Sequence, residues 1–139
     1  MSHLIRFMSS NKFAVVGASQ DRAKFGNKIL QWYIDHKLEV APINPKAPQI
    51  ENIPTYPSLA ALPNPSEYSV SVVTPPKVTA EVLREAQQLG IKNLWLQPGS
   101  EDMTSVNEIR SLDPSLNIIA GAGECVLVLG SDAQQKAHL

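Results

Sequence analysis

Two glycines with a basic stretch between them mark the first place in the chain where a ligand could bind. Gly17 follows an apolar run, and the next glycine is Gly26, with Arg22 and Lys24 between them. A dinucleotide-binding turn would instead show the shorter pattern G-x-G-x-x-G. Backbone N–H groups, the Ser19 hydroxyl, two cations and the start of a helix together favour an anion such as a diphosphate. The alternative is a solvated surface loop that binds nothing specific.

The segment Asn44-Pro45-Lys46 comes after the second predicted strand and narrows the choice of ligand. Sites for NAD place Asp or Glu at this position, where the carboxylate accepts a hydrogen bond from the ribose 2′-hydroxyl. A lysine attracts a phosphate instead, as on the ribose of NADP or in coenzyme A with its 3′-phosphate. Alternatively, Lys46 is simply an exposed residue of a turn.

No set of residues shows the spacing of a catalytic or metal-binding motif. The histidines, His3, His36 and His138, lie far apart and follow no motif of a phosphoryl carrier. Cys125 is the single cysteine, and its thiol could form a mixed disulfide with the thiol of a ligand or could be a small buried apolar group. We therefore expect no catalytic residue and no metal, and the sequence favours a protein that is not an enzyme.

Strand-like and helix-like segments alternate along the chain, which is the pattern of an α/β fold with a parallel sheet. Apolar runs predict strands at 12–17, 39–44, 69–74, 93–97, 116–120 and 125–129. Helical periodicity predicts helices at 26–37 and 76–89, and a third helix that Ser100 caps. Right-handed crossovers arrange these elements as one Rossmann-like domain: a doubly wound, mainly parallel sheet with helices on both faces. Ligands of such sheets bind outside the carboxyl ends of the strands.

The ends of the chain and one internal passage depart from this pattern. Residues 1–10 are expected to form a short surface helix or arm, and residues 131–139 a polar, frayed tail. Residues 42–65 hold seven of the eleven prolines, so we expect an ordered connection with one helical turn at 58–62. The apolar run at 125–129 could pair at a sheet edge, so a homo-oligomer or a protein partner is one option.

Charge and composition argue against several classes of protein. Lys plus Arg total 12 and Asp plus Glu total 13, so the chain lacks the broad basic surface of a nucleic-acid binder. Its apolar runs are far shorter than the ~20 residues that span a bilayer, so we expect no membrane association. One cysteine and the absence of a secretory signal predict a cytoplasmic protein, with a mitochondrial presequence as the alternative.

Five motifs occur in a fixed order, namely VVGAS, the basic loop to Gly26, INPK, VVTPP and LWLQPGSE. In this order and spacing they resemble the family of small stand-alone CoA-binding domains, whose Rossmann-like fold is similar to the N-terminal domain of the succinyl-CoA synthetase α subunit. The resemblance covers residues 11–130, which we expect to form the CoA-binding domain. The apolar run at 125–129 departs from the family, whose members often carry a more polar or basic stretch there.

The resemblance implies a ligand, coenzyme A or acyl-CoA, and the residues that hold it. The diphosphate would be held by Gly17, Ala18, Ser19, Arg22, Lys24, Gly26 and Asn27. The adenosine 3′-phosphate would lie against Asn44, Pro45 and Lys46. The adenine or pantetheine side would be walled by Thr74, Pro75, Pro76 and Val78, and the cleft would be closed by Gln97 and Gly99.

Three functions remain open on this basis. The first is a non-catalytic binding module or sensor for coenzyme A or acyl-CoA, acting alone or through a partner. The second is an NADP-type dinucleotide-binding protein or a fragment of an oxidoreductase. The third is a redox protein that forms a CoA mixed disulfide at Cys125.

Overall fold

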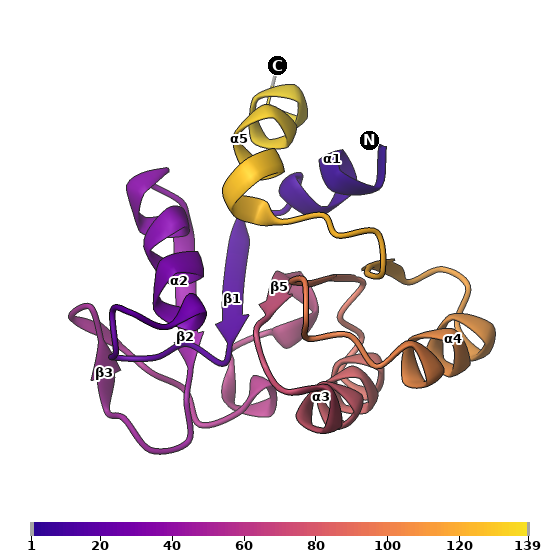
Figure 1. Cartoon of the computed structure of the whole chain (residues 1–139), viewed down its shortest axis with the longest axis horizontal. Coiled ribbons are helices and arrows are strands. Elements are labelled where there is room, and N and C mark those ends of the chain that lie inside the picture. The colour runs from indigo at the N-terminus through magenta and orange to yellow at the C-terminus, as the bar shows by residue number, and fades with distance from the viewer. Residues whose placement is uncertain (1, 139) are drawn as a thin grey trace.

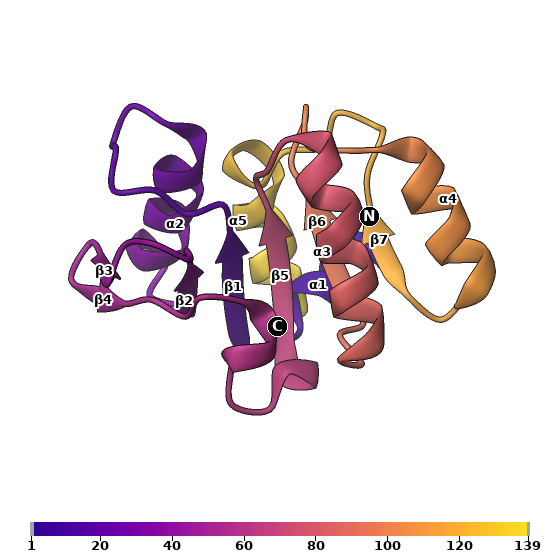
Figure 2. The same ribbon diagram turned by 90° about the horizontal axis from the view of Figure 1, so that it is seen from below.

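A five-stranded parallel sheet, in the order β2-β1-β5-β6-β7, runs through the molecule. The computed structural model describes residues 2–138. The strands of the sheet are β1 (Lys12–Val16), β2 (Glu39–Ile43), β5 (Tyr68–Val72), β6 (Asn93–Leu96) and β7 (Asn117–Ile119). Figure 2 shows β1 and β5 running in the same direction at the centre of the sheet. This arrangement confirms the predicted Rossmann-like α/β fold.

Helices cover both faces of the sheet. One face carries α1 (Ser2–Met8), α2 (Phe25–Asp35) and α5 (Val126–Ala137), and the other carries α3 (Pro76–Gln88) and α4 (Met103–Leu112). In Figure 1, α1 and α5 lie together on one side of the strands and α3 and α4 on the other. Because both faces are covered, the strands are almost continuously buried, as expected of a parallel sheet.

Smaller elements come after β2 in the proline-rich passage. They are the antiparallel pair β3 (Gln49–Ile50) and β4 (Ile53–Pro54) and the 3-10 turns η1 (Leu59–Ala61) and η2 (Pro65–Glu67). Tyr56 pairs with the edge of β2, since its N–H donates to Pro42 at 3.1 Å and its carbonyl accepts from the N–H of Asn44 at 2.9 Å. The passage is therefore ordered, and its predicted helical turn is present as η1.

Polar side chains within the sheet are buried but hydrogen-bonded. Ser69 and Ser71 of β5 are fully buried. The Ser71 hydroxyl lies 2.6 Å from that of Tyr33, and the Ser69 hydroxyl donates to the carbonyl of Phe7 at 2.8 Å. Burial raises the pKa of Tyr33 well above its ordinary value. These bonds tie α2 and α1 to the central strand, because a buried polar group is costly without a partner.

The N-terminal segment is helical, as predicted, but its apolar side chains are not on the surface. Leu4, Phe7 and Met8 of α1 are at most 1% exposed. The Phe7 ring meets the Trp95 ring edge-on, with 5.4 Å between the ring centroids. Helix α1 therefore forms part of the core, and only the short apolar face of a seven-residue helix could have signalled this in the sequence.

The predictions of a last strand at 125–129 and of a frayed tail at 131–139 are wrong. Residues 126–137 form helix α5, so the proposed strand pairing at this run does not exist. A short apolar run fits a buried strand or a helix equally well. Helix α5 buries Val126, Gly130 and Ala133, which are spaced as one helical face.

Helix α4 also begins later than predicted. Its N-terminal capping position is Asp102 rather than Ser100, and the Asp102 carboxylate accepts a hydrogen bond from the hydroxyl of Ser105 at 3.0 Å. Within residues 2–138, none of the helices combines the length and the apolar character that crossing a bilayer requires.

A glycine fixes how closely α5 packs on α2. A Cβ atom at Gly130 would lie 2.5 Å from the Trp32 ring and 2.8 Å from a methyl group of Val126. In an exposed helix, Gly→Ala stabilises by up to about 1 kcal/mol, but overpacking a core costs roughly 1–3 kcal/mol. We expect Gly130→Ala to lower the free energy of unfolding, and Gly130→Val to lower it further, as measured by urea denaturation.

The matched control is Gln135→Ala, which changes an exposed position of the same helix and should alter stability by less than about 0.5 kcal/mol. If Gly130→Ala were more stable than the unsubstituted protein, the tight contact between α2 and α5 would be disproved.

Candidate ligand-binding site

The order of the strands reverses at β1, because the strand that follows it in the chain lies on one side and the later strands lie on the other. Such a reversal leaves a crevice at the carboxyl end of β1. From β1 the sheet continues to β2 on one side, while β5 lies on the other. In open α/β sheets, ligands bind at such a switch point, outside the carboxyl ends of the strands. The loop 17–24 after β1 and the segment 73–75 after β5 meet at this place, so the crevice is where a ligand would be sought.

A pocket of about 500 Å³, which we call the loop pocket, occupies the crevice. Its lining residues come from the carboxyl ends of three strands and the start of α2, and are Gly17, Ala18, Ser19, Lys24, Phe25, Gly26, Asn44, Val73, Thr74 and Pro75. Seven of the predicted diphosphate and wall residues, Gly17, Ala18, Ser19, Lys24, Gly26, Thr74 and Pro75, are thus brought together.

Two glycines allow the backbone to close tightly around this pocket. Gly17 has a φ of +91°, and a Cβ there would lie 2.1 Å from the carbonyl oxygen of Val73. A Cβ at Gly26 would lie 2.0 Å from the carbonyl oxygen of Gly17. Side chains at either position would push β1, α2 and the end of β5 apart.

The start of α2 faces the loop pocket through Lys24, Phe25 and Gly26. The first N–H groups of a helix lack intrahelical acceptors and carry a partial positive charge. The first turn of α2 has no acidic residue, and its capping position, Lys24, makes no side-chain hydrogen bond to the helix. This helix end is therefore electrostatically suited to an anion.

Asn44 joins the first loop to the turn after β2. Its Nδ2 donates to the carbonyl of Ala18 at 3.0 Å. Its Oδ1 accepts from the N–H groups of Lys46 at 2.8 Å and Ala47 at 2.9 Å. Because one carboxamide bonds to both segments, the position of Lys46 is set relative to the loop after β1.

Lys46 lines a second pocket of about 500 Å³, the lysine pocket, together with Ser19, Gln20, Asp21, Asn44, Ala47 and Pro48. This pocket shares Ser19 and Asn44 with the loop pocket. The side chain of Lys46 is exposed and bears no carboxylate partner among residues 2–138. A positive charge therefore lies next to the loop pocket, at the end of β2.

A third pocket of about 250 Å³, the apolar pocket, adjoins the loop pocket. It shares Gly17, Ala18, Asn44 and Thr74 with the loop pocket, and the predicted residues Pro45 and Val78 line it. Its remaining lining residues are Val16, Ile43, Pro57, Ser58, Leu59, Val82 and Glu85. The three pockets thus adjoin one another, and we refer to them together as the depression over the ends of β2, β1 and β5.

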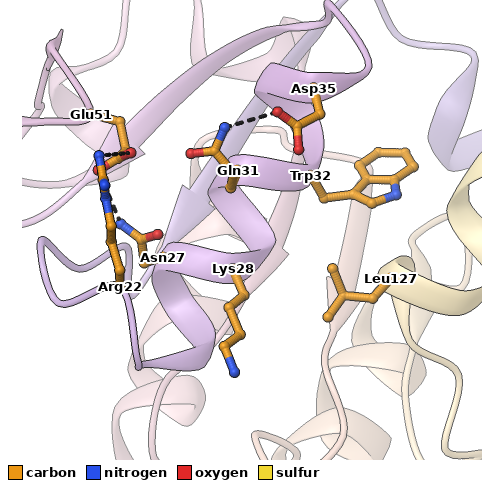
Figure 3. A pocket seen from close by; sticks show the side chains of 8 residues that line it. All are labelled: Arg22, Asn27, Lys28, Gln31, Trp32, Asp35, Glu51 and Leu127. Carbon is orange, nitrogen blue, oxygen red and sulfur yellow. Dashed lines mark hydrogen bonds and ion pairs between the residues drawn. The ribbon is translucent and has the colours of Figure 1, made fainter.

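Arg22 and Asn27 were predicted to hold a diphosphate, but their side chains bond elsewhere. The Arg22 guanidinium donates to both carboxylate oxygens of Glu51, at 3.2 and 3.3 Å, and its side chain is 80% exposed. The buried Asn27 donates to the carbonyl of Ser19 at 2.9 Å and lies 3.5 Å from Glu51. Figure 3 shows these three side chains meeting at the edge of a separate pocket beside α2.

The pocket of Figure 3 has a volume of about 590 Å³ and lies on the flank of the molecule. Trp32 of α2 and Leu127 of α5 form its opposite side, and Lys28, Gln31 and Asp35 complete the lining. The only residues that it takes from the predicted set are Arg22 and Asn27. It has none of the strand ends that define a ligand crevice in this class of fold.

The remaining predicted residues lie outside the three connected pockets. Gln97 is fully buried, and its Oε1 accepts from the N–H of Val126 at 3.0 Å, while its Nε2 has no partner within residues 2–138. Gly99 is exposed, and its N–H donates to Glu101 at 2.9 Å. Pro76 begins α3, and the half-buried Cys125 precedes α5.

Several residues of the depression were not predicted from the sequence. Pro57 lies just before the predicted turn at 58–62, Ser58 and Leu59 lie within it, and Val82 lies within the helix predicted at 76–89, but none of the four was assigned to a site. Glu85 lies one helical turn after Val82 on the same face of α3, so helical spacing could have identified it. Among residues 2–138, no cluster of three His, Cys, Asp or Glu side chains could hold a metal.

Comparison with known proteins gives a family and several relatives. A family model described as a CoA binding domain matches residues 11–131. An acetate–CoA ligase (ADP-forming) from Archaeoglobus fulgidus is 33% identical over 82 residues, or 57% of this chain, but the match spans only 12% of that ligase.

Solved structures with the same fold include two stand-alone archaeal proteins. A conserved hypothetical protein from Pyrococcus furiosus is 35% identical, with a TM-score of 0.76 over 85% of this chain and 97% of its own. A hypothetical protein from Pyrococcus horikoshii is 25% identical, with a TM-score of 0.80 over 96% of this chain and 92% of its own.

The hydrogen bonds of Asn44 predict a measurable loss when they are removed. Asn44→Ala deletes three hydrogen bonds, so we expect the free energy of unfolding to fall by roughly 1–3 kcal/mol. Asn44→Asp keeps the two bonds that Oδ1 accepts and should lose less. Asn107→Ala, an exposed change on α4, is the control and should stay within about 0.5 kcal/mol of the unsubstituted protein. Equal stability of Asn44→Ala and Asn107→Ala would contradict the assigned role.

Proposed function

Because this chain belongs to the CoA-binding domain family, we propose that it binds coenzyme A or an acyl-CoA in the depression over β1, β2 and β5. The observation that carries the proposal is the arrangement of the loop pocket and the lysine pocket. They share Ser19 and Asn44, and they present a helix start and a lysine in place of a ribose-binding carboxylate. A ligand with a diphosphate and one further phosphate fits this pattern of charge.

The loop pocket is proposed to hold the diphosphate. Gly17 and Gly26 let the backbone approach the ligand closely, and the helix start and Lys24 supply positive charge. Lys46, one pocket further along the sheet edge, would bind the 3′-phosphate of the adenosine. Asn44 would position Lys46 without being required to touch the ligand.

The role proposed for the chain is that of a binding module. One relative with a named activity is a CoA ligase, and the matching segment is a small part of that enzyme. Residues 2–138 place no group of three potential metal ligands together, and no titratable side chain of the loop pocket other than Lys24 faces the proposed diphosphate. The geometry therefore supports holding a CoA ligand rather than transforming it.

An NADP-type ligand is the second candidate, because Lys46 would also suit a ribose 2′-phosphate. The two ligands differ in the position of the additional phosphate and in the group attached to the far side of the diphosphate. Titration with both ligands separates the two proposals directly.

Isothermal titration calorimetry with CoA, dephospho-CoA and NADP tests the proposal. We expect CoA to bind more tightly than dephospho-CoA, which lacks the 3′-phosphate, and NADP to bind weakly. Lys46→Ala should weaken CoA binding about ten-fold and leave dephospho-CoA binding nearly unchanged, because only the phosphate contact is lost. Lys136→Ala, the same change in the last turn of α5, should have no effect. Binding of NADP without binding of CoA would overturn the proposal.

The ion pair of Arg22 gives a second test. Glu51 holds the Arg22 guanidinium away from the loop pocket, and we propose that the ligand competes with Glu51 for this cation. We expect Glu51→Gln to strengthen CoA binding by up to about five-fold, since an ion pair at the surface contributes about 0.2–1 kcal/mol. The gain should vanish in the double variant Arg22→Ala, Glu51→Gln. A loss of affinity in Glu51→Gln would mean that the pair only holds the loop in shape.

A further inference from the structure

The apolar pocket differs from its two neighbours in the charge that it presents. The loop pocket and the lysine pocket each carry a lysine, Lys24 and Lys46, and the lysine pocket also carries Asp21, whereas the apolar pocket has no cation among its lining residues and its one charged residue is Glu85. A phosphate would be repelled by this carboxylate. The apolar pocket must therefore take an uncharged part of a ligand.

We propose that the apolar pocket is a subsite for the adenine base and that Glu85 accepts a hydrogen bond from the exocyclic amino group of that base. This inference rests on the proposed function, because it assigns one part of the CoA ligand to the pocket. It adds a residue, Glu85, that selects adenine over other purines.

The walls of the pocket suit a flat, apolar ring. They include Pro45, Pro57, Leu59, Val78 and Val82, and the pocket volume of about 250 Å³ admits a purine but is half that of the loop pocket, at about 500 Å³. The wall from residues 57–59 is fixed, because Tyr56 is hydrogen-bonded to the edge of β2 immediately before it. A ring would thus enter a preformed slot, which lowers the entropy lost on binding.

Glu85 lacks a partner inside the protein. Its half-buried carboxylate makes no hydrogen bond and no ion pair with any of residues 2–138. An ionised carboxylate only accepts hydrogen bonds, so it requires an N–H or O–H group from whatever fills the pocket. The amino group of adenine carries two such hydrogens.

The same carboxylate discriminates against bases that carry oxygen in place of the amino group. Guanine and hypoxanthine present a carbonyl oxygen there, and two acceptors facing each other repel. A base that covers the pocket also excludes water, so Glu85 would be left without any hydrogen bond. Sites that bind a substrate N–H reject analogues without it for this reason.

The pantetheine arm is the other part of the ligand that could fill an apolar pocket. Its occupancy would leave the base outside, and the identity of the base would then not affect binding. The choice between the two occupants is therefore open to measurement.

The test compares CoA with its hypoxanthine analogue, in which the adenine amino group is replaced by oxygen. In calorimetric titrations of the unsubstituted protein, we expect CoA to bind at least about ten-fold more tightly than the analogue. In Glu85→Gln the preference should fall to about two-fold or less, because a carboxamide can accept from the amino group or donate to the oxygen. Glu81→Gln, an exposed position one turn earlier on α3, is the control and should retain the full preference.

Each outcome bears on a separate claim. Equal binding of CoA and the analogue to the unsubstituted protein would overturn the adenine subsite while leaving the proposed function intact. A preference that survives in Glu85→Gln would overturn the role of Glu85. Failure of CoA itself to bind would overturn the proposed function. Because Glu85 has no internal partner among residues 2–138, thermal unfolding should show that Glu85→Gln is as stable as Glu81→Gln.

Discussion

The close approach of three backbone segments at the end of β1 is the constraint on which the rest of the structure depends. Gly26 lies against the carbonyl of Gly17, and Gly17 lies against the carbonyl of Val73, with no room for a Cβ atom at either glycine. This stacking brings the start of α2 and the end of β5 together across the switch point of the sheet. The long basic loop between the glycines is then displayed at the rim of the crevice rather than buried in it. The loop thus begins at the end of β1 and leads to the start of α2, as a phosphate-binding turn does, but it is longer and exposed.

The charged side chains are unevenly distributed over the three pockets of the depression, and this distribution agrees with the parts of the proposed CoA ligand. Lys24 lines the loop pocket, Lys46 and Asp21 line the lysine pocket, and Glu85 of α3 is the one charged residue that lines the apolar pocket. Asn44 lies at the centre and bonds to both the loop and the turn that carries Lys46. A single rigid carboxamide therefore relates the proposed diphosphate, phosphate and base subsites. We therefore expect the affinity for the proposed ligand to come from several contacts, one in each subsite, rather than from one strong contact.

The strands of the sheet and most of the residues at their carboxyl ends were predictable, because short apolar runs and the residues that follow them can be read from the local sequence. Apolar runs end in Gly17, Asn44 and Thr74, and a parallel sheet necessarily brings such ends to one edge. The partner of Arg22 was not predictable, since Glu51 is 29 residues away and belongs to a hairpin of two-residue strands. Helix α5 was mistaken for a strand because a five-residue apolar run has no decisive period. Helical spacing places Glu85 on the same face of α3 as Val82, but only the packed structure shows that its carboxylate has no partner among residues 2–138.

Amide chemical shifts recorded during titration with coenzyme A test most directly whether the ligand binds at this edge of the sheet. In a ¹⁵N-labelled sample, we predict that the largest shifts occur at the N–H groups of residues 17–26, of Lys46 and of Thr74, with smaller shifts on α3 near Glu85. The outer face of α4, at Thr104, Asn107 and Ser111, forms another pocket and should be unaffected. Saturable shifts centred on α4, or none in the depression at millimolar CoA, would contradict a CoA site over β1, β2 and β5.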